Sequence, residues 1–108
     1  MTRILMRAVA ALALTLGASA AFAAGNAGDG KIKAYSCTGC HGIVGYKNVY
    51  PHYHVPKIHG QNAAYIMAAL NAYKNGERPH PTMRAQGESL SPQDIEDIAA
   101  YLSSTDGK

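Results

Sequence analysis

Apolar residues recur at helical spacing in the second half of the chain. They fall three or four positions apart between Asn62 and Lys74, as expected for one face of a helix. The apolar positions of this stretch are Ile66, Leu70 and Tyr73. Asn62 is a suitable N-cap, and Asn75-Gly76 is a typical stop signal. The pattern therefore predicts a helix from about residue 62 to residue 74.

The C-terminal helix has the clearest signals. Ser91 is a suitable N-cap, Pro92 occupies the first helical position, and Asp94 completes a capping-box-like pair. Its predicted buried stripe consists of Ile95, Ile98, Ala99 and Leu102. Acidic residues in the first turn favour the positive end of the helix dipole. We expect this helix to run from Pro92 to about Ser103.

The remaining segments predict one more short helix and long loops. Residues 24–29 read as a flexible lead-in, and residues 31–38 as a short helix. Five glycines and prolines between residues 41 and 61 forbid a long helix, so a structured loop is expected there. Two prolines, Pro79 and Pro81, predict an extended segment through residues 80–83. No stretch alternates with period two, and the predicted fold is all-α, with three to four short helices.

The first 23 residues look like a secretory signal peptide. Arg3 and Arg7 precede an apolar run over residues 8–16, and Ala21-Phe22-Ala23 is a suitable cleavage triplet. An uncleaved anchor is the alternative, but the apolar stretch is shorter than the ~20 residues of a spanning helix. We therefore expect a leader over residues 1–23, one domain over residues 24–108, export to the periplasm, and no stable membrane span after cleavage.

Removing the leader changes the composition and the charge. The chain of 108 residues is 47% hydrophobic, but the residues after position 23 contain only 14 Ile, Leu, Val and Met, with no Trp or Phe. A domain this small has a marginal core even when well stocked, so a cofactor, metal, disulfide or partner is needed. The net charge falls from +3 to +1 without Arg3 and Arg7. Nothing indicates a basic face for nucleic acid.

Both cysteines lie in the motif Cys37-Thr38-Gly39-Cys40-His41, for which three chemistries compete. Thiol redox exchange is one, although its usual strand–helix alternation is missing. Zinc is another, and would need two further ligands. The histidines available for that are His52, His54, His59 and His80. Covalent haem attachment is the third, with this spacing as its signature.

The haem interpretation explains most of the sequence. The thiols of Cys37 and Cys40 would add to the two vinyl groups of one haem, and His41 would lie under the iron as an axial ligand. An export signal favours it, because haem c is attached outside the bacterial cytoplasm. A buried haem would also supply the apolar body that the sequence lacks. We expect one covalent haem c with its iron as the cofactor.

The sixth iron ligand decides what such a haem does. Met67 lies inside a predicted helix, where a core role explains it. Met83 lies in a polar, proline-bracketed segment without a packing reason, so it is the expected ligand. His80 is an alternative if the loop rearranges. A thioether and an imidazole hold iron six-coordinate and raise its potential, which suits electron transfer rather than substrate binding.

Residues 34–102 resemble a class I monohaem cytochrome c of the small bacterial periplasmic type, and one half of the two-haem bacterial cytochromes. The motifs that match are Cys37-Thr38-Gly39-Cys40-His41-Gly42 with Gly45, Pro56-Lys57-Ile58-His59-Gly60-Gln61, Tyr73-Lys74-Asn75-Gly76-Glu77-Arg78, Met83, and Asp94-Ile95 with Ala99-Ala100-Tyr101-Leu102. The resemblance implies a small cytochrome c fold in which the N- and C-terminal helices cross. It also implies that the carbonyl of Pro56 orients His41.

One departure from the family and several functional expectations follow. Residues 46–54 are longer and more aromatic than expected, while His59 reads as structural. The expected function is a periplasmic electron carrier, not itself an enzyme, that meets redox donors and acceptors at the exposed haem edge, as a monomer or weak oligomer. Two rivals are a cytochrome subunit of a periplasmic oxidoreductase and a haem-based ligand sensor.

Overall fold

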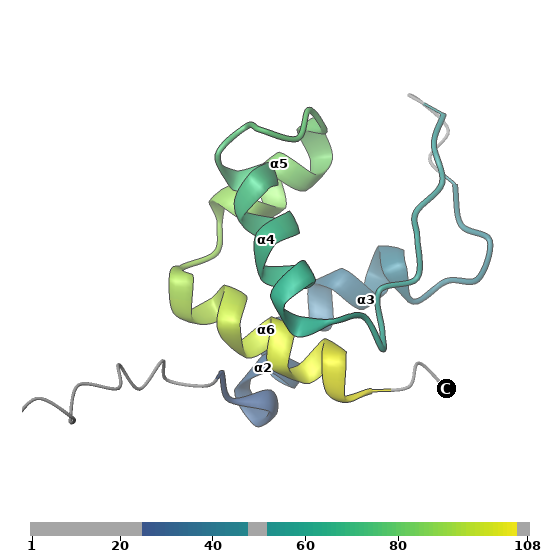
Figure 1. The fold of residues 1–108 in the computed structure, drawn as a ribbon. Helices are drawn as coiled ribbons and strands as arrows, with labels where there is room; N and C mark the ends of the chain where they lie inside the picture. The colour runs from purple at the N-terminus through teal and green to yellow at the C-terminus, as the bar shows by residue number, and fades with distance from the viewer. Residues whose placement is uncertain (1–24, 48–51, 106–108) are drawn as a thin grey trace, which may run out of the picture.

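The computed structural model describes residues 25–47 and 52–105, and within them the chain forms helices. The helices are α2 (Ala27–Lys33), α3 (Tyr35–His41), α4 (Ala63–Lys74), α5 (Pro81–Glu88) and α6 (Pro92–Ser104), with one long connection, between α3 and α4 (Figure 1). Within the described residues the only β pairing is an isolated bridge between Lys47 and His54. The all-α prediction is confirmed. The predicted leader lies outside the described residues.

Helix α2 begins earlier than predicted. Residues 25 and 26 are followed at once by the helix, so the expectation of a flexible lead-in through residue 29 is wrong. The side chain of Asn26 accepts hydrogen bonds from the amides of Gly28 and Asp29, at 2.8 and 3.2 Å. This cap satisfies amides that have no partner inside the helix. Residues 24–29 are small and polar and show no helical apolar pattern, so the helix start at Ala27 was not predicted.

The single helix expected over residues 31–38 is in fact two. Helices α2 and α3 meet at Ala34, which ends one and precedes the other, with φ −77° and ψ 0°. Ala34 is completely buried, because the chain turns at this residue to bring its small side chain against α6. Helix α3 is therefore free to diverge from α2, and it carries the whole cysteine motif.

The two helices predicted from capping signals are confirmed. Asn62 caps α4 by accepting the amide of Tyr65 at 3.1 Å, and the helix ends before Gly76, whose φ is +79°. Ser91 and Asp94 form a complete capping box at the start of α6, as predicted. Each of these ends is encoded by side chains within three residues of the boundary.

The extended segment predicted for residues 80–83 is wrong beyond its first residue. Helix α5 begins at Pro81, with His80 as its N-cap. A proline is tolerated at the first helical position because its missing amide has no partner there and its φ already suits a helix. Pro81 therefore starts a helix instead of preventing one. As a result, Met83 lies in the first turn of α5 and not in a loop.

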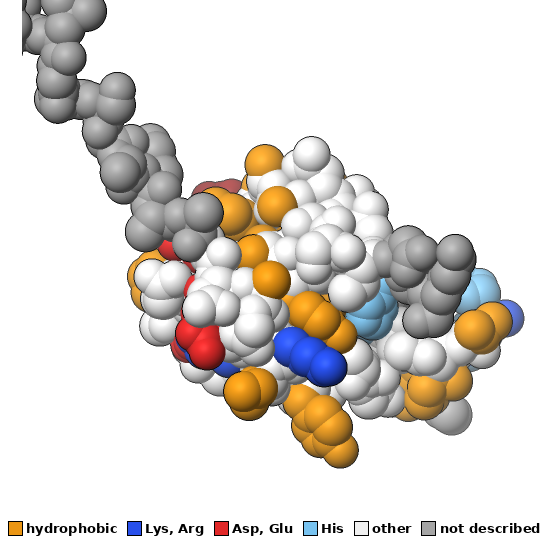
Figure 2. Space-filling model, turned by 90° about the horizontal axis from the view of Figure 1, so that it is seen from below, with side chains coloured by type: hydrophobic (Ala, Val, Ile, Leu, Met, Phe, Trp, Pro, Cys, Tyr) orange, Lys and Arg blue, Asp and Glu red, His pale blue; other side chains and the backbone are white. Residues whose placement is uncertain are grey.

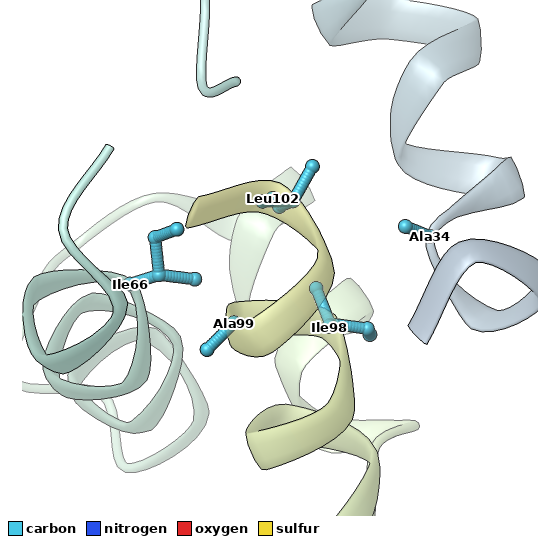
Figure 3. Packing of buried hydrophobic residues seen from close by; sticks show 5 residues of the cluster. All are labelled: Ala34, Ile66, Ile98, Ala99 and Leu102. Carbon is cyan, nitrogen blue, oxygen red and sulfur yellow. The ribbon is translucent and has the colours of Figure 1, made fainter. Parts of the chain in front are cut away.

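Helix α6 is the centre of the hydrophobic core. Its residues Ile98, Ala99 and Leu102 lie between Ile66 of α4 on one side and Ala34 on the other (Figure 3). The predicted stripe is confirmed, since Ile95, Ile98, Ala99 and Leu102 are each at most 1% exposed. Full burial of a large aliphatic side chain stabilises a fold by about 1.5–3 kcal/mol. The stripe thus packs α6 between α4 on one side and the α2–α3 junction at Ala34 on the other.

Helix α2 crosses α6 at very short range. Gly30 is buried, and a Cβ atom at this position would collide with the backbone of Asp97. A glycine inside a helix normally costs about 0.5–1 kcal/mol relative to alanine. Here it allows the two backbones to approach. The expected crossing of the N- and C-terminal helices is present, made by α2 rather than by a helix over residues 31–38.

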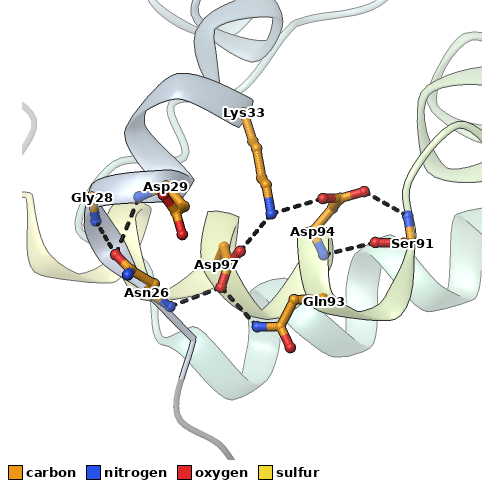
Figure 4. A network of polar contacts seen from close by, with 8 residues as sticks. All are labelled: Asn26, Gly28, Asp29, Lys33, Ser91, Gln93, Asp94 and Asp97. Carbon is orange, nitrogen blue, oxygen red and sulfur yellow. Dashed lines mark hydrogen bonds and ion pairs between the residues drawn. The ribbon is translucent and has the colours of Figure 1, made fainter.

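A polar network joins the same two helices (Figure 4). The carboxylate of Asp97, only 2% exposed, accepts hydrogen bonds from Lys33 Nζ at 2.5 Å, the Asn26 amide at 2.8 Å and Gln93 Nε2 at 2.9 Å. Lys33 also pairs with Asp94 at 2.9 Å. Lys33, followed by the Asn26 amide, lowers the pKa of Asp97 to about 2. All three hydrogen bonds to Asp97 favour the ionised form of its carboxylate.

The surface shows no uniform charge on the face that Figure 2 presents. Acidic side chains gather near one end of that face, histidines lie toward the other, and single hydrophobic side chains protrude between them. Of the helices in residues 25–47 and 52–105, none combines the length and apolarity needed to cross a membrane.

Candidate functional site

A cavity of about 470 Å³ opens between α3, the loop that follows it, α4 and α5. Its walls are largely apolar side chains, which include Val55, Ile58, Ile66, Leu70, Leu90, Ile98 and Leu102. Four polar or sulfur-bearing side chains singled out in the sequence also line it: Cys37, Cys40, His41 and Met83. The structure therefore brings residues from positions 37 to 83 to one hollow.

Cys37 and Cys40 occupy one side of α3. They are three residues apart, which places them on the same helical face, and both thiols are free. Cys37 is half-buried and Cys40 is exposed. Burial raises the pKa of the Cys37 thiol. Reactive cysteines of thiol redox proteins instead have a lowered pKa, so the environment of Cys37 does not favour that chemistry.

His41 is the last residue of α3 and is held by the loop. Its Nδ1 lies 2.6 Å from the carbonyl oxygen of Pro56. Because a carbonyl oxygen only accepts, Nδ1 carries the proton and donates it, and Nε2 keeps its lone pair. The contact that the family resemblance implied is thus present. A fixed tautomer with a free Nε2 is the form of histidine that binds a metal.

The loop that supplies Pro56 is itself anchored. The amide of Gly60 donates to the carbonyl of Leu102 at 2.8 Å, which ties the end of the loop to α6. At its other end, the Val55 amide donates to the carbonyl of Tyr46 at 3.0 Å. His59 packs edge-on against Tyr101, with ring centroids 6.3 Å apart, outside the cavity lining. This contact agrees with a structural role for His59.

The two methionines of the folded domain occupy different environments. Met67 packs against the hydrophobic core and does not line the cavity. Met83 lies in the first turn of α5 and lines the cavity. The distinction drawn from the sequence therefore corresponds to a difference in location, although its reason was partly wrong, because Met83 is helical.

The histidines do not assemble a zinc site within the described residues. No group of three or more His, Cys, Asp or Glu side chains there lies close enough to hold a metal ion. His54 and His80 line the cavity, while His52 is exposed and His59 lies against Tyr101. Neither zinc nor thiol exchange is supported by the arrangement around Cys37 and Cys40.

One cluster on the cavity wall was not predicted from the sequence. It consists of three aromatic side chains, Tyr53, Tyr73 and His80, with Arg78 and Thr82 beside them. Tyr73 was visible only as an apolar position of the predicted helix and as part of a family motif. Tyr53 lies 27 residues before His80 in the chain, and no local pattern connects them. Only the tertiary fold brings this cluster together.

The cavity fits a flat apolar cofactor that is linked through two thioethers. Its lining supplies aliphatic and aromatic contacts, two thiols on one helical face, and an imidazole nitrogen with a free lone pair. These are the groups that covalent haem c requires: sulfur atoms for the vinyl carbons and an axial nitrogen for the iron. The donor set therefore matches haem c better than any other cofactor considered.

The similarity of this chain to known proteins supports a haem c site. The chain matches the family model of cytochrome c over residues 26–106. It is 39% identical over 84 residues to cytochrome c-554(548) of Halomonas halodenitrificans, covering 75% of this chain and 98% of that protein. It is also 40% identical over 94 residues to cytochrome c4 of Pseudomonas aeruginosa, covering 86% of this chain and 45% of that protein.

A solved structure shows the same relationship. The fold superimposes on cytochrome c4 of Acidithiobacillus ferrooxidans with a TM-score of 0.61 at 28% identity, covering 73% of this chain and 49% of that chain. The chain spans about half the length of the cytochrome c4 proteins that it matches. It therefore belongs to the cytochrome c family, as a domain resembling one half of cytochrome c4, with haem c bound covalently through Cys37 and Cys40.

Proposed function

We propose that this protein is a periplasmic carrier of single electrons whose haem iron is ligated by His41 and Met83. The observation that carries the proposal is the placement of these two residues, from α3 and α5, on the wall of one cavity with both cysteines. Haem c bound there supplies an iron that alternates between the ferric and ferrous states. Membership of the cytochrome c family supports electron transfer as the function.

The chain's own residues hold the cofactor and supply the ligands of its iron. Cys37 and Cys40 anchor the cofactor, and Pro56 fixes the tautomer of His41. A thioether from Met83 is neutral and soft, which favours ferrous iron and raises the potential. Ligation by both His41 and Met83 would leave no open position on the iron for a substrate, which favours a carrier over an enzyme.

Redox donors and acceptors are proposed to contact the surface near the cysteine motif. Cys40 is exposed there, and the residues that follow His41 include Ile43, 51% exposed, and Val44, fully exposed. Exposed apolar residues beside a redox centre suit a small, transient interface. The net charge of about +1 after leader removal gives little long-range steering, so local contacts decide partner choice.

The location and assembly state are also proposals. The basic, apolar and small-residue pattern of residues 1–23 supports cleavage of a leader and release of residues 24–108 into the periplasm. We propose a monomer or weak oligomer. A partner that co-purifies in fixed stoichiometry would instead favour the role of a subunit in an oxidoreductase.

The experiment compares Met83→Ala with Met67→Ala after expression in a host that attaches haem c. We expect the wild type and Met67→Ala to show a weak far-red ferric band from sulfur ligation, and Met83→Ala to lack it. Ferrous wild type should not bind carbon monoxide without denaturation. A far-red band that survives in Met83→Ala would refute this ligand, and carbon monoxide binding by the wild type would favour a sensor.

A further inference from the structure

The first turn of α5 is capped by an unusual residue. His80 is its N-cap, and His80 Nδ1 accepts the backbone amide of Met83 at 3.2 Å. Because an amide only donates, Nδ1 must carry the lone pair and Nε2 the proton. The common N-caps are Ser, Thr, Asp and Asn. A histidine in this position does the same bonding and adds a ring that other residues can hold.

The prolines fix the backbone on which this cap depends. Pro81 restricts His80 to an extended conformation, observed at φ −151° and ψ 98°. Pro81 has no amide of its own, and the cap bonds the amide at the third helical position. That position is Met83. The backbone of Met83 is thereby set relative to the ring of His80.

The ring of His80 contacts two tyrosines from other segments of the chain. Tyr53 approaches it edge-on, with ring centroids 4.4 Å apart and planes at 72°. Tyr73 of α4 does the same at 5.9 Å and 75°. The guanidinium of Arg78 lies 4.4 Å from the centre of the Tyr73 ring. Aromatic pairs of this geometry are favourable beyond the area that they bury.

A second contact joins the same loop to α5. The hydroxyl groups of Tyr53 and Thr82 are 3.1 Å apart and form a hydrogen bond. Tyr53 therefore touches both the cap residue and the residue just before Met83. All of these groups line the cavity that Met83 lines. Of the segment 46–54, whose residues 48–51 lie outside the described chain, Tyr53 thus connects the loop to the methionine side of the site.

We propose that His80, held by Tyr53 and Tyr73, is a positioning residue that fixes Met83 toward the iron. The inference rests on the proposed ligation by Met83. It assigns a role to Tyr53 within the segment that departs from the family pattern. It also excludes His80 from ligation in this conformation, because the lone pair of Nδ1 is used by the Met83 amide and Nε2 is protonated.

The test uses His80→Ala, the capping variant His80→Asn, and His59→Ala as a matched control. His59 is also half-buried and edge-on to a tyrosine, but it lies outside the cavity lining. Each ferric protein is titrated with imidazole, which competes with Met83 for the iron, and the far-red sulfur band and thermal midpoint are recorded. Asparagine restores the cap without the ring, which separates capping from general stability.

We expect His80→Ala to weaken the far-red band and to bind imidazole roughly fivefold more tightly, the size expected from a lost helix cap. His80→Asn should recover most of this loss. His59→Ala should match the wild type in the far-red band and in its affinity for imidazole. Tyr53→Phe, which keeps the ring but loses the hydroxyl bond to Thr82, should show a smaller change of the same sign. It replaces His80→Ala if that variant fails to take up haem.

Two results would overturn the inference, and they differ from each other. If the wild type shows the sulfur band but His80→Ala and Tyr53→Phe bind imidazole no more tightly than His59→Ala, His80 does not position Met83. A stronger band in His80→Ala would likewise contradict it, because His80 would then be a competing ligand. If the wild type itself lacks the band, the proposed ligation by Met83 fails, and this inference fails with it.

Discussion

At the scale of single residues, the cysteine motif has two unequal members. Cys37 is half-buried beside the core, whereas Cys40 is exposed at the cavity edge. Both bind the same cofactor, so each thioether is a separate link between α3 and haem. The two links should be separable by substitution, while His41 remains held by the carbonyl of Pro56.

We expect Cys37→Ser and Cys40→Ser each to retain haem through one thioether, and the double variant to retain none after denaturation. The physical reason is that each thiol forms one covalent bond to the macrocycle. Mass spectrometry of the denatured proteins measures this directly. Attachment of haem in the denatured double variant would contradict the assignment, as would its complete loss from both single variants in a competent host.

The site residues differ in how far the sequence alone predicts them. Cys37, Cys40 and His41 are adjacent and carry their own spacing, so their chemistry is local. Pro56 could be proposed only from the family resemblance, because nothing in its neighbours indicates a contact to His41. His80 and Tyr53 were beyond prediction in their present role, since their contact depends on how a loop packs against α5.

At the scale of elements, the crossing of α2 and α6 combines a small residue with a charged network. Gly30 allows the close approach, and Asp97 receives three donors at the same crossing. Asp97 is almost completely buried, so its carboxylate depends on these donors and not on water. This crossing joins the N-terminal half, with the cysteine motif, to the C-terminal helix.

The acid stability of the fold should depend on Asp97. Its pKa is lowered from 3.8 to about 2 in the folded protein, so its stabilisation is complete above about pH 4. That stabilisation is lost as the pH falls through 2, because the folded state then has to be protonated. We expect Asp97→Asn to be less stable than the wild type at neutral pH and to approach it between pH 4 and 2.

Denaturant unfolding at a series of pH values measures the difference between the two proteins. Glu77→Gln is the matched control, because Glu77 is an exposed carboxylate outside the network. Its profile should parallel that of the wild type. A constant difference between Asp97→Asn and the wild type from pH 6 to pH 2 would contradict the linkage.

The helix boundaries differ in whether local sequence signals are enough to predict them. Asn62, Ser91 and Asp94 encode their helix starts within three residues, and those boundaries were predictable. The boundary at Ala34 was not, because the break there follows from burial against α6 and not from a breaker residue. The start of α5 was predicted wrongly, since a proline was taken to prevent a helix that it in fact begins.

At the scale of the whole molecule, the cavity interrupts the core. The fully buried aliphatic residues of the described chain are concentrated on α6, and several of them also face the cavity. A bound haem therefore completes the interior that the sequence lacks. Contacts between the haem and the cavity wall form only in the folded state, so they stabilise it, and the covalent links keep the cofactor at the site.

We expect the haem-free Cys37→Ser, Cys40→Ser double variant to lose most of its cooperative unfolding. Without the cofactor, apolar side chains around the cavity face water, and the remaining core is too small for a domain of this size. Circular dichroism during thermal unfolding measures the change, with Met67→Ala as a haem-bearing control. A haem-free chain with the thermal midpoint of the wild type would contradict this account of the core.

The most direct test of the electron-carrier proposal is a potentiometric titration followed by visible absorbance. The account predicts one reversible wave with the slope of a single electron. It also predicts a potential that falls by roughly 0.1 V or more in Met83→Ala, within the ~0.8 V range over which axial ligands set haem potentials. Met67→Ala should keep the potential of the wild type. An irreversible titration, or equal potentials in the wild type and Met83→Ala, would contradict a carrier ligated by His41 and Met83.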